Sequence, residues 1–182
     1  MKISLRPYEL SMAKKLADLC RTYYAKEIDD AWRRYEWPFC EPVVCEQYAL
    51  DFISTSFMDE SPTAYGIYAN RSRIGMIALT QVDEQGGYAQ LGTYITPQAR
   101  GHGYQLVAKE LLFARLPPSL HTLYCFIEDT NRASIASIQK IRHQTLVSDL
   151  SSLPKLVTLQ CQRIGKPHHI YRIDLSAYRP SS

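Results

Sequence analysis

The spacing of hydrophobic residues divides the chain into a helical first third and a strand-rich remainder. Residues 2–6 alternate between apolar and polar and predict a first strand. Between Met12 and Tyr35 apolar residues recur at helical spacing, which predicts one long helix or two shorter ones. Residues 36–42 hold two prolines and predict a loop, and residues 45–58 predict a further helix.

From residue 64 onward the pattern becomes that of strands. A turn signal and the glycine pair Gly86-Gly87 join three segments into a predicted antiparallel meander. These strands are residues 64–69, 73–82 and 88–96. A helix follows from Tyr104 and ends before Pro117-Pro118. The remaining elements are a strand, a helix and two strands at residues 121–127, 131–142, 155–163 and 169–175. This order predicts a mixed α/β fold of the α+β class rather than a doubly wound sheet.

Composition narrows the class of protein. The 182 residues suffice for one domain, 1–182, with a sizeable core, and 46% of them are hydrophobic. A net charge of +3 is too small to indicate a nucleic-acid partner. No apolar run reaches the roughly 20 residues of a membrane span, and the N-terminus lacks a signal-peptide pattern. The five widely spaced cysteines form neither a disulfide framework nor a metal site, so we expect a cytoplasmic protein without a metal.

A glycine-bearing segment between the third meander strand and the next helix carries the clearest candidate chemistry. Its sequence is Arg100-Gly101-His102-Gly103-Tyr104-Gln105. Glycines let a backbone approach a ligand closely, and the first amides of a helix have no partner within the helix. Such a turn predicts an anion site suited to a pyrophosphate.

Two common phosphate-binding motifs do not fit this segment. A P-loop needs Gly-Lys-Ser/Thr after its first glycine, which is absent. A Rossmann fingerprint needs a third glycine where Leu106 stands, and it lies in a parallel βαβ unit, whereas a hairpin meander precedes this turn.

In this context the segment resembles the GNAT superfamily of N-acetyltransferases, whose signature is Gln/Arg-x-x-Gly-x-Gly/Ala between the fourth strand and a helix. Arg100 and Gly103 supply the arginine and the central glycine, while Gln105 departs from the last position. A register that begins at Gln98 also matches formally, but the helical pattern after Tyr104 favours the first.

Two further segments resemble the branch of this superfamily that acetylates ribosomal-protein N-termini. Asn131 and Ser134, with Lys140 following, match a helix of that branch, although Arg142-His143 replaces its Gly-Phe pair. Residues 91–95 resemble its Gly-Tyr-Trp strand. The three segments occur in the order that the superfamily shows, and the resemblance covers essentially the whole chain.

The resemblance implies a GNAT-like fold, with a mostly antiparallel twisted sheet of about seven strands flanked by about four helices. It implies acetyl-coenzyme A as co-substrate, with its pantetheine arm between the fourth and fifth strands, which splay apart. On this chain the pyrophosphate would bind backbone amides of residues 100–105. The backbone near Tyr94 and Ile95 would bond the arm and the acetyl carbonyl, and Asn131 and Ser134 would face the cofactor.

The proton transfers of the reaction are harder to assign. An attacking amine must lose a proton, and the departing thiolate is helped by an acid. Family members often carry a glutamate on the fourth strand and a tyrosine after the motif asparagine, where this chain has Gln90 and Ile138. The candidate bases are Glu128 and Asp129, and the candidate acids are Tyr94, Tyr124 and Ser137.

An aromatic cluster lies where the family places the loop that covers the acceptor. Trp32, Tyr35 and Trp37 are the candidate acceptor-binding residues, and core packing is the alternative. The resemblance predicts an N-acetyltransferase that transfers acetyl to a small-molecule or peptide primary amine by direct attack through a ternary complex. The alternatives are a non-catalytic acyl-coenzyme A-binding module and a general nucleotide-binding protein. The resemblance also allows a homodimer.

Overall fold

The computed structural model describes residues 2–15, 18, 57–58, 61–164 and 167–179. The helices predicted within 12–35 and 45–58 therefore lie almost entirely outside the described residues, as does the loop predicted at 36–42. Residues 13–15 are helical. Phe57–Met58 is not the end of a helix but a short strand, β2, which pairs antiparallel with β3 (Ser61–Pro62).

The predicted first strand and the meander are confirmed. The strands are β1 (Ile3–Pro7), β4 (Ala64–Ala69), β5 (Ser72–Asp83) and β6 (Tyr88–Ile95). β4 pairs antiparallel with β1 and β5, and β5 pairs antiparallel with β6. Asn70, in the turn between β4 and β5, has φ of 56°, a left-handed conformation that asparagine adopts more readily than most residues.

Three later strands complete a seven-stranded sheet of order β1-β4-β5-β6-β7-β9-β8. They are β7 (Thr122–Glu128), β8 (Gln144–Leu146) and β9 (His168–Asp174). β6 and β7 form the parallel pair, and the other neighbours in this sheet are antiparallel. The segment between β6 and β7 contains α4 (Tyr104–Phe113), the helical crossover that a parallel connection requires. The predicted mixed α/β, mostly antiparallel architecture is thereby confirmed.

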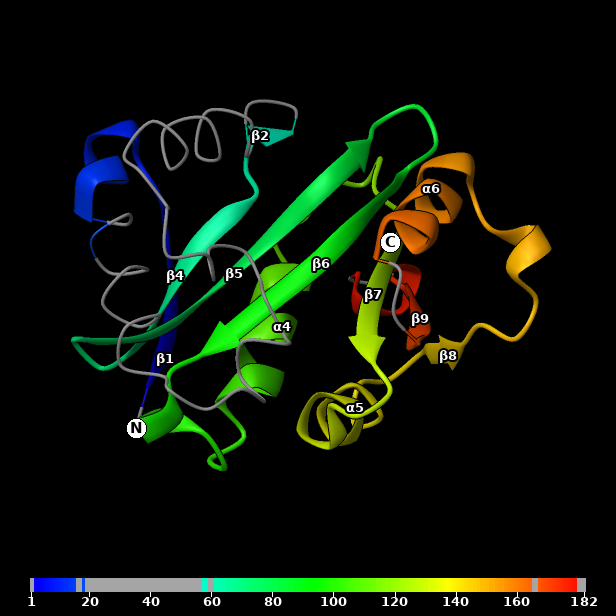
Figure 1. Ribbon diagram of the computed structural model, residues 1–182. Coiled ribbons are helices and arrows are strands. Elements are labelled where there is room, and N and C mark those ends of the chain that lie inside the picture. Colours follow the sequence, from blue (N-terminus) through cyan, green and yellow to red (C-terminus); the bar gives the residue numbers. More distant parts are fainter. Residues whose placement is uncertain (1, 16–17, 19–56, 59–60, 165–166, 180–182) are drawn as a thin grey trace.

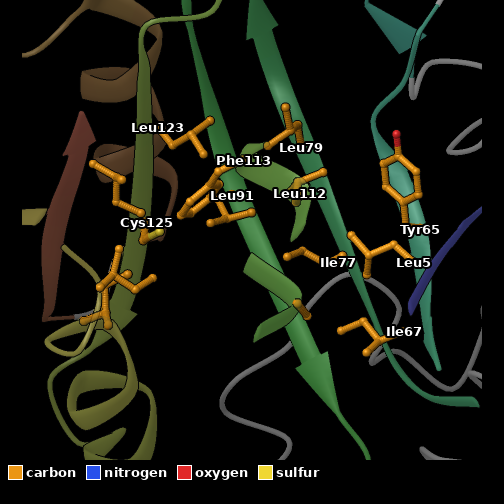
Figure 2. Packing of buried hydrophobic residues seen from close by; sticks show 14 of the residues in the cluster. Leu5, Tyr65, Ile67, Ile77, Leu79, Leu91, Leu112, Phe113, Leu123 and Cys125 are labelled. Carbon is orange, nitrogen blue, oxygen red and sulfur yellow. The ribbon is translucent and has the colours of Figure 1, made fainter. Parts of the chain in front are cut away.

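The described helices cover opposite faces of this sheet (Figures 1 and 2). α4 and α5 (Arg132–Ile138) pack on one face, where Leu112 and Ile138 join the main core. α6 (Lys155–Ile164) packs on the other, where Val157 joins a smaller cluster with Tyr124. We call these the α4 face and the α6 face. No helix in the described part of the chain combines the length and the apolar character needed to cross a membrane.

Strand alternation assigns the side chains of β6 and β7 to these two faces. Leu91 and Leu123 belong to the main core on the α4 face, and Tyr88 and Tyr124 belong to the cluster on the α6 face. Because successive strand residues point to opposite faces, odd-numbered residues of β6 and β7 lie on the α4 face and even-numbered ones on the α6 face.

The prediction of a strand at 155–163 is wrong, because this segment is the helix α6. Its buried side follows a spacing of four: Val157 is buried, and Leu153 and Cys161 pack beside it. Pro154 precedes the first helical residue, a position that suits helix initiation. The strand partner of β9 is instead β8, whose three residues are too few to show a periodic pattern.

Candidate functional site

The ladder between β6 and β7 ends partway along both strands. The last paired residues are Gln90 and Tyr124. Beyond them β6 stays paired with β5 as far as Ile95, and β7 stays paired with β9 as far as Glu128. Residues 91–95 and 125–128 therefore separate from each other, as Figure 1 shows below the labels of the two strands. We call these two segments the divergence. Their backbone groups on the inner side have no ladder partner among the described residues, and those that are not bonded elsewhere are available to a ligand.

A glycine turn connects the β6 side of the divergence to α4. The Thr96 amide donates to the Ile74 carbonyl oxygen at 2.8 Å, and a 3-10 turn, Pro97–Ala99, follows. Gly101 and Gly103 have φ of 81° and 75°, which residues with a Cβ rarely adopt. A Cβ atom at either glycine would meet nothing within 4 Å among its surroundings. The space above both glycines is therefore open.

Several amides of this turn have no backbone acceptor within the described residues. The Leu106 amide donates to the Gly103 carbonyl oxygen at 3.2 Å, and Gly103, the N-cap residue of α4, offers no side-chain cap. Within the described residues, the amides of Gly101, His102 and Gln105 donate to no backbone carbonyl oxygen. Unpaired amides at the positive end of a helix dipole favour a phosphate group.

Arg100 ties the turn to the end of β6. Its Nε donates to the Ile95 carbonyl oxygen at 3.0 Å, and its guanidinium carbon lies 5.8 Å from the centroid of the Tyr94 ring. His102 is exposed and stacks on Tyr104, with ring centroids 5.3 Å apart. Arg100 thus links the glycine turn to Tyr94 and Ile95 at the end of β6, while cofactor binding by these residues stays a prediction.

The candidate acids and bases do not share one face. Tyr94 and Glu128 are half-buried, and alternation directs both to the α6 face, one from each side of the divergence. Ser137 belongs to α5, which packs on the opposite face. Asp129 follows β7 and is exposed, and Tyr124 lies in the last β6–β7 pair, where burial raises the pKa of its phenol. The structure thus brings Tyr94 and Glu128 to the same face and leaves Ser137 apart from them.

Asn131 is the N-cap of α5. Its side-chain oxygen accepts from the Ser134 amide at 3.1 Å, and the Asn131 amide donates to the Glu128 carbonyl oxygen at 2.9 Å. This capping uses only the oxygen of the Asn131 side chain, so its NH₂ group is available to a ligand beside the end of β7. Cofactor contact by Asn131 and Ser134 stays a prediction.

Three polar side chains near the divergence have no partner among the described residues. The Gln90 Oε1 and Thr93 Oγ1 atoms of β6 are buried and accept or donate no hydrogen bond there. Lys109 of α4 is only 4% exposed and forms no hydrogen bond or ion pair within the described part of the chain. Thr93 and Lys109 were not predicted from the sequence. The available signal was that Lys109 lies three residues before Leu112, on the buried side of its helix.

Burial also governs the titration of Lys109 and of Cys125 in β7. Desolvation lowers the pKa of the Lys109 amine, an effect that the nearby Cys125 thiol partly offsets. Desolvation raises the pKa of the Cys125 thiol to about 11, although Lys109 acts in the opposite direction. Burial thus disfavours the charged form of each group. A buried thiol with its pKa raised in this way is a poor nucleophile.

The predicted acceptor-binding residues Trp32, Tyr35 and Trp37 lie outside the described residues. Within the described ranges, no group of three or more His, Cys, Asp or Glu side chains could hold a metal ion.

Comparison with solved structures shows the same fold in several acetyltransferases. The microcin C7 self-immunity acetyltransferase MccE, solved with acetyl-CoA and AMP, is 17% identical, with a TM-score of 0.66 over 95% of this chain and 92% of that chain. The ribosomal L7/L12 α-N-protein acetyltransferase RimL, solved with coenzyme A, is 16% identical, with a TM-score of 0.64 over 94% of this chain and 92% of that chain. Spermidine N-acetyltransferase from Vibrio cholerae, solved with CoA and spermine, is 15% identical, with a TM-score of 0.63 over 97% of both chains.

Sequence comparison points to the same family. No curated protein matches the chain. The family model for the acetyltransferase (GNAT) domain matches residues 2–144, well over half of the chain. This range contains the glycine turn, both strands of the divergence and the Asn131 cap. The chain therefore belongs to the GNAT acetyltransferase family and is an enzyme of the N-acetyltransferase class.

Proposed function

We propose that this protein transfers an acetyl group from acetyl-coenzyme A to a primary amine by direct attack within a ternary complex. The observation that carries the proposal is the glycine turn, whose open space and unpaired amides adjoin the divergence of β6 and β7. A pyrophosphate fits the amides of Gly101, His102 and Gln105. An extended arm fits between the diverging strands, where it would complete their inner hydrogen bonds.

Backbone and side-chain groups of this chain would bind the thioester and carry out the proton transfers. The backbone of β6 at Tyr94 and Ile95 would donate to the thioester carbonyl oxygen and hold it for attack. The carboxylate of Glu128, on the α6 face, would accept the proton that the amine loses. The Tyr94 hydroxyl, on that same face, is our candidate donor to the departing sulfur. Positioning of two substrates side by side supplies a large part of the rate even without an ideal acid and base.

We further propose that the acceptor is a peptide or protein amine and that the whole chain is one cytoplasmic domain. The likeness of residues 131–140 to the ribosomal-protein branch supports the acceptor class. The two described cysteines, Cys125 and Cys161, are free thiols, as is usual in a reducing compartment.

A homodimer is a further proposal, since Leu146 of the edge strand β8 is 47% exposed and Leu150 beyond it is 55% exposed. Analytical ultracentrifugation tests the dimer.

Thermal denaturation with and without acetyl-coenzyme A tests the cofactor site. A ligand that binds only the folded state stabilises it by about 2.7 kcal/mol at a hundredfold excess over Kd. We expect a clear rise in melting temperature that Gly103→Trp abolishes, because the indole would fill the open space at the turn. No rise at millimolar cofactor, in a protein that melts cooperatively, would refute the proposal.

Release of free thiol separates an enzyme from a binding module. We expect coenzyme A to appear only when acetyl-coenzyme A and a suitable amine are both present. The panel of amines includes peptides with free N-termini and polyamines such as spermidine, after which the similar acetyltransferase from Vibrio cholerae is named. Binding without thiol release across the panel would favour the non-catalytic module.

A further inference from the structure

Lys109 is an unusual residue for the interior of a helix that packs on a sheet. It is 4% exposed, although lysine is almost never fully buried without a partner. Within the described residues no carboxylate or carbonyl oxygen accepts from its amine. Burial of a polar group without a partner lowers stability, and the lowered pKa of the amine reflects this. Lys109 therefore adds nothing evident to the stability of the ligand-free fold.

The position of Lys109 relates it to the divergence. Its amine interacts electrostatically with Cys125, which is the first residue of β7 beyond the last β6–β7 pair. Cys125 is odd-numbered and lies on the α4 face, labelled in Figure 2 beside Leu123 and Leu91. The amine thus lies on the α4 side of the place where the strands begin to separate.

Thr93 approaches the same place from β6. It is three residues beyond Gln90, the last β6 residue that pairs with β7, and alternation directs it to the α4 face. Its Oγ1 atom is buried and has no hydrogen-bond partner among the described residues. Two strands and one helix therefore direct polar side chains toward one side of the divergence, and two of these side chains lack partners.

The chemistry of these two groups indicates what would satisfy them. A hydroxyl can donate and accept a hydrogen bond, and the amine of a lysine can donate one. An amide offers one donor and one acceptor, and a chain with amides can therefore pair with both groups. A phosphate would instead require a charged lysine, which burial at this position disfavours.

We propose that Lys109 and Thr93 form hydrogen bonds with the amide-bearing pantetheine arm of coenzyme A from the α4 face of the divergence. This inference rests on the proposed function, because it assumes that coenzyme A is the ligand. It assigns a binding role to two side chains, in addition to the backbone of β6 and the amides of the glycine turn.

Two conservative variants test the proposal by calorimetric titration. Lys109→Met removes the amine and retains the length of the side chain, and Thr93→Val removes the hydroxyl at equal volume. Lys155→Met, an exposed lysine on the α6 face, is the matched control. Each protein is titrated with coenzyme A and with its nucleotide half alone, adenosine 3′-phosphate 5′-diphosphate, which lacks the arm.

We expect each test variant to bind coenzyme A about three- to tenfold more weakly, the value of one hydrogen bond. Affinity for the nucleotide half should not change, and the melting temperature of ligand-free Lys109→Met should not fall. Wild-type affinity of both variants for coenzyme A would overturn the inference, as would an equal loss for the two ligands. If wild-type protein binds neither ligand, the proposed function fails and this inference fails with it. If Lys109→Met does not fold, Thr93→Val alone decides between these outcomes.

Discussion

The Nε atom of Arg100 donates a hydrogen bond to the carbonyl oxygen of Ile95, with 3.0 Å between the two atoms. Ile95 is the last residue of β6, and Arg100 opens the glycine turn. The bond therefore closes the loop between the divergence and the N-terminus of α4. In the proposed complex it would set the distance between the arm of the cofactor and its pyrophosphate.

Replacement of Arg100 by lysine tests this positioning role. Lysine keeps the charge but has no planar Nε–H, so it cannot reproduce the bond to Ile95 together with the approach to the Tyr94 ring. We expect Arg100→Lys to weaken coenzyme A binding about three- to tenfold, with less than about 1 kcal/mol lost in unfolding free energy because the side chain is exposed. Isothermal titration and urea denaturation measure the two effects. Arg71→Lys, on an exposed turn, is the control, and equal affinities for all three proteins would contradict the role.

The pairing of β5 with β6 depends on Gly75. A Cβ atom there would lie 2.1 Å from the carbonyl oxygen of Tyr94 and 3.1 Å from the Cα of Ile95, both backbone atoms that cannot rotate away. We expect Gly75→Ala to lower the unfolding free energy by about 2 kcal/mol or more and to weaken cofactor binding, because the end of β6 must shift. Urea denaturation checks the first effect.

Gly66→Ala is the matched control for Gly75. Its Cβ would lie 2.9 Å from a ring carbon of Tyr68, which is the far end of a side chain and can move. Gly66→Ala should therefore cost less stability and leave cofactor binding intact. Equal losses for the two variants would show that the contact with Tyr94 has no special importance.

Substitution of Asn131 separates its capping of α5 from its proposed contact with the cofactor. Asn131→Ala removes the cap on the Ser134 amide and should cost about 0.5–2 kcal/mol of stability. Asn131→Asp keeps an oxygen for the cap but lacks the NH₂ group that the cofactor would use. We expect Asn131→Asp to melt like the wild type and to bind coenzyme A more weakly. Full affinity in that variant would assign Asn131 to capping alone, as measured by melting curves with and without cofactor.

Lys109 should make stability depend on pH. Burial lowers its pKa in the folded protein below the 10.5 of an ordinary lysine. At pH values between the folded and unfolded pKa the unfolded chain binds more protons, so unfolding free energy rises with pH through that window. At lower pH the buried amine is a net cost.

Chemical denaturation of the wild type and of Lys109→Met across this pH range tests the expectation. The stability advantage of the methionine variant should be largest at low pH and should shrink as pH approaches 10.5. Cys125, whose pKa is raised to about 11, is present in both proteins. Its own titration therefore largely cancels in the difference between their unfolding free energies. A difference that does not change with pH would show that Lys109 titrates normally.

Local patterns in the sequence were sufficient for the elements that carry the turn. Alternation and turn residues identify β4, β5 and β6, and the glycines at 101 and 103 mark the entry to α4 where their positive φ angles are found. These signals are local because backbone sterics and hydrogen-bond period act within a few residues. For α6 the local signal misled, since its β-branched and apolar residues resemble a strand until Val157 and Cys161 are seen to pack on one face.

The sequence by itself determined the kind of turn, the order of most elements and the resemblance to the GNAT family. Only the tertiary structure decided where β6 and β7 stop pairing and that Tyr94 and Glu128 share a face that Ser137 does not. It also decided that Lys109 is buried without a hydrogen-bond or ion-pair partner among the described residues. Each of these depends on contacts between segments far apart in the chain, and neither hydrophobic period nor residue type carries that information. A lysine in an amphipathic helix is ordinarily a surface residue, and only packing against β7 makes this one an internal group.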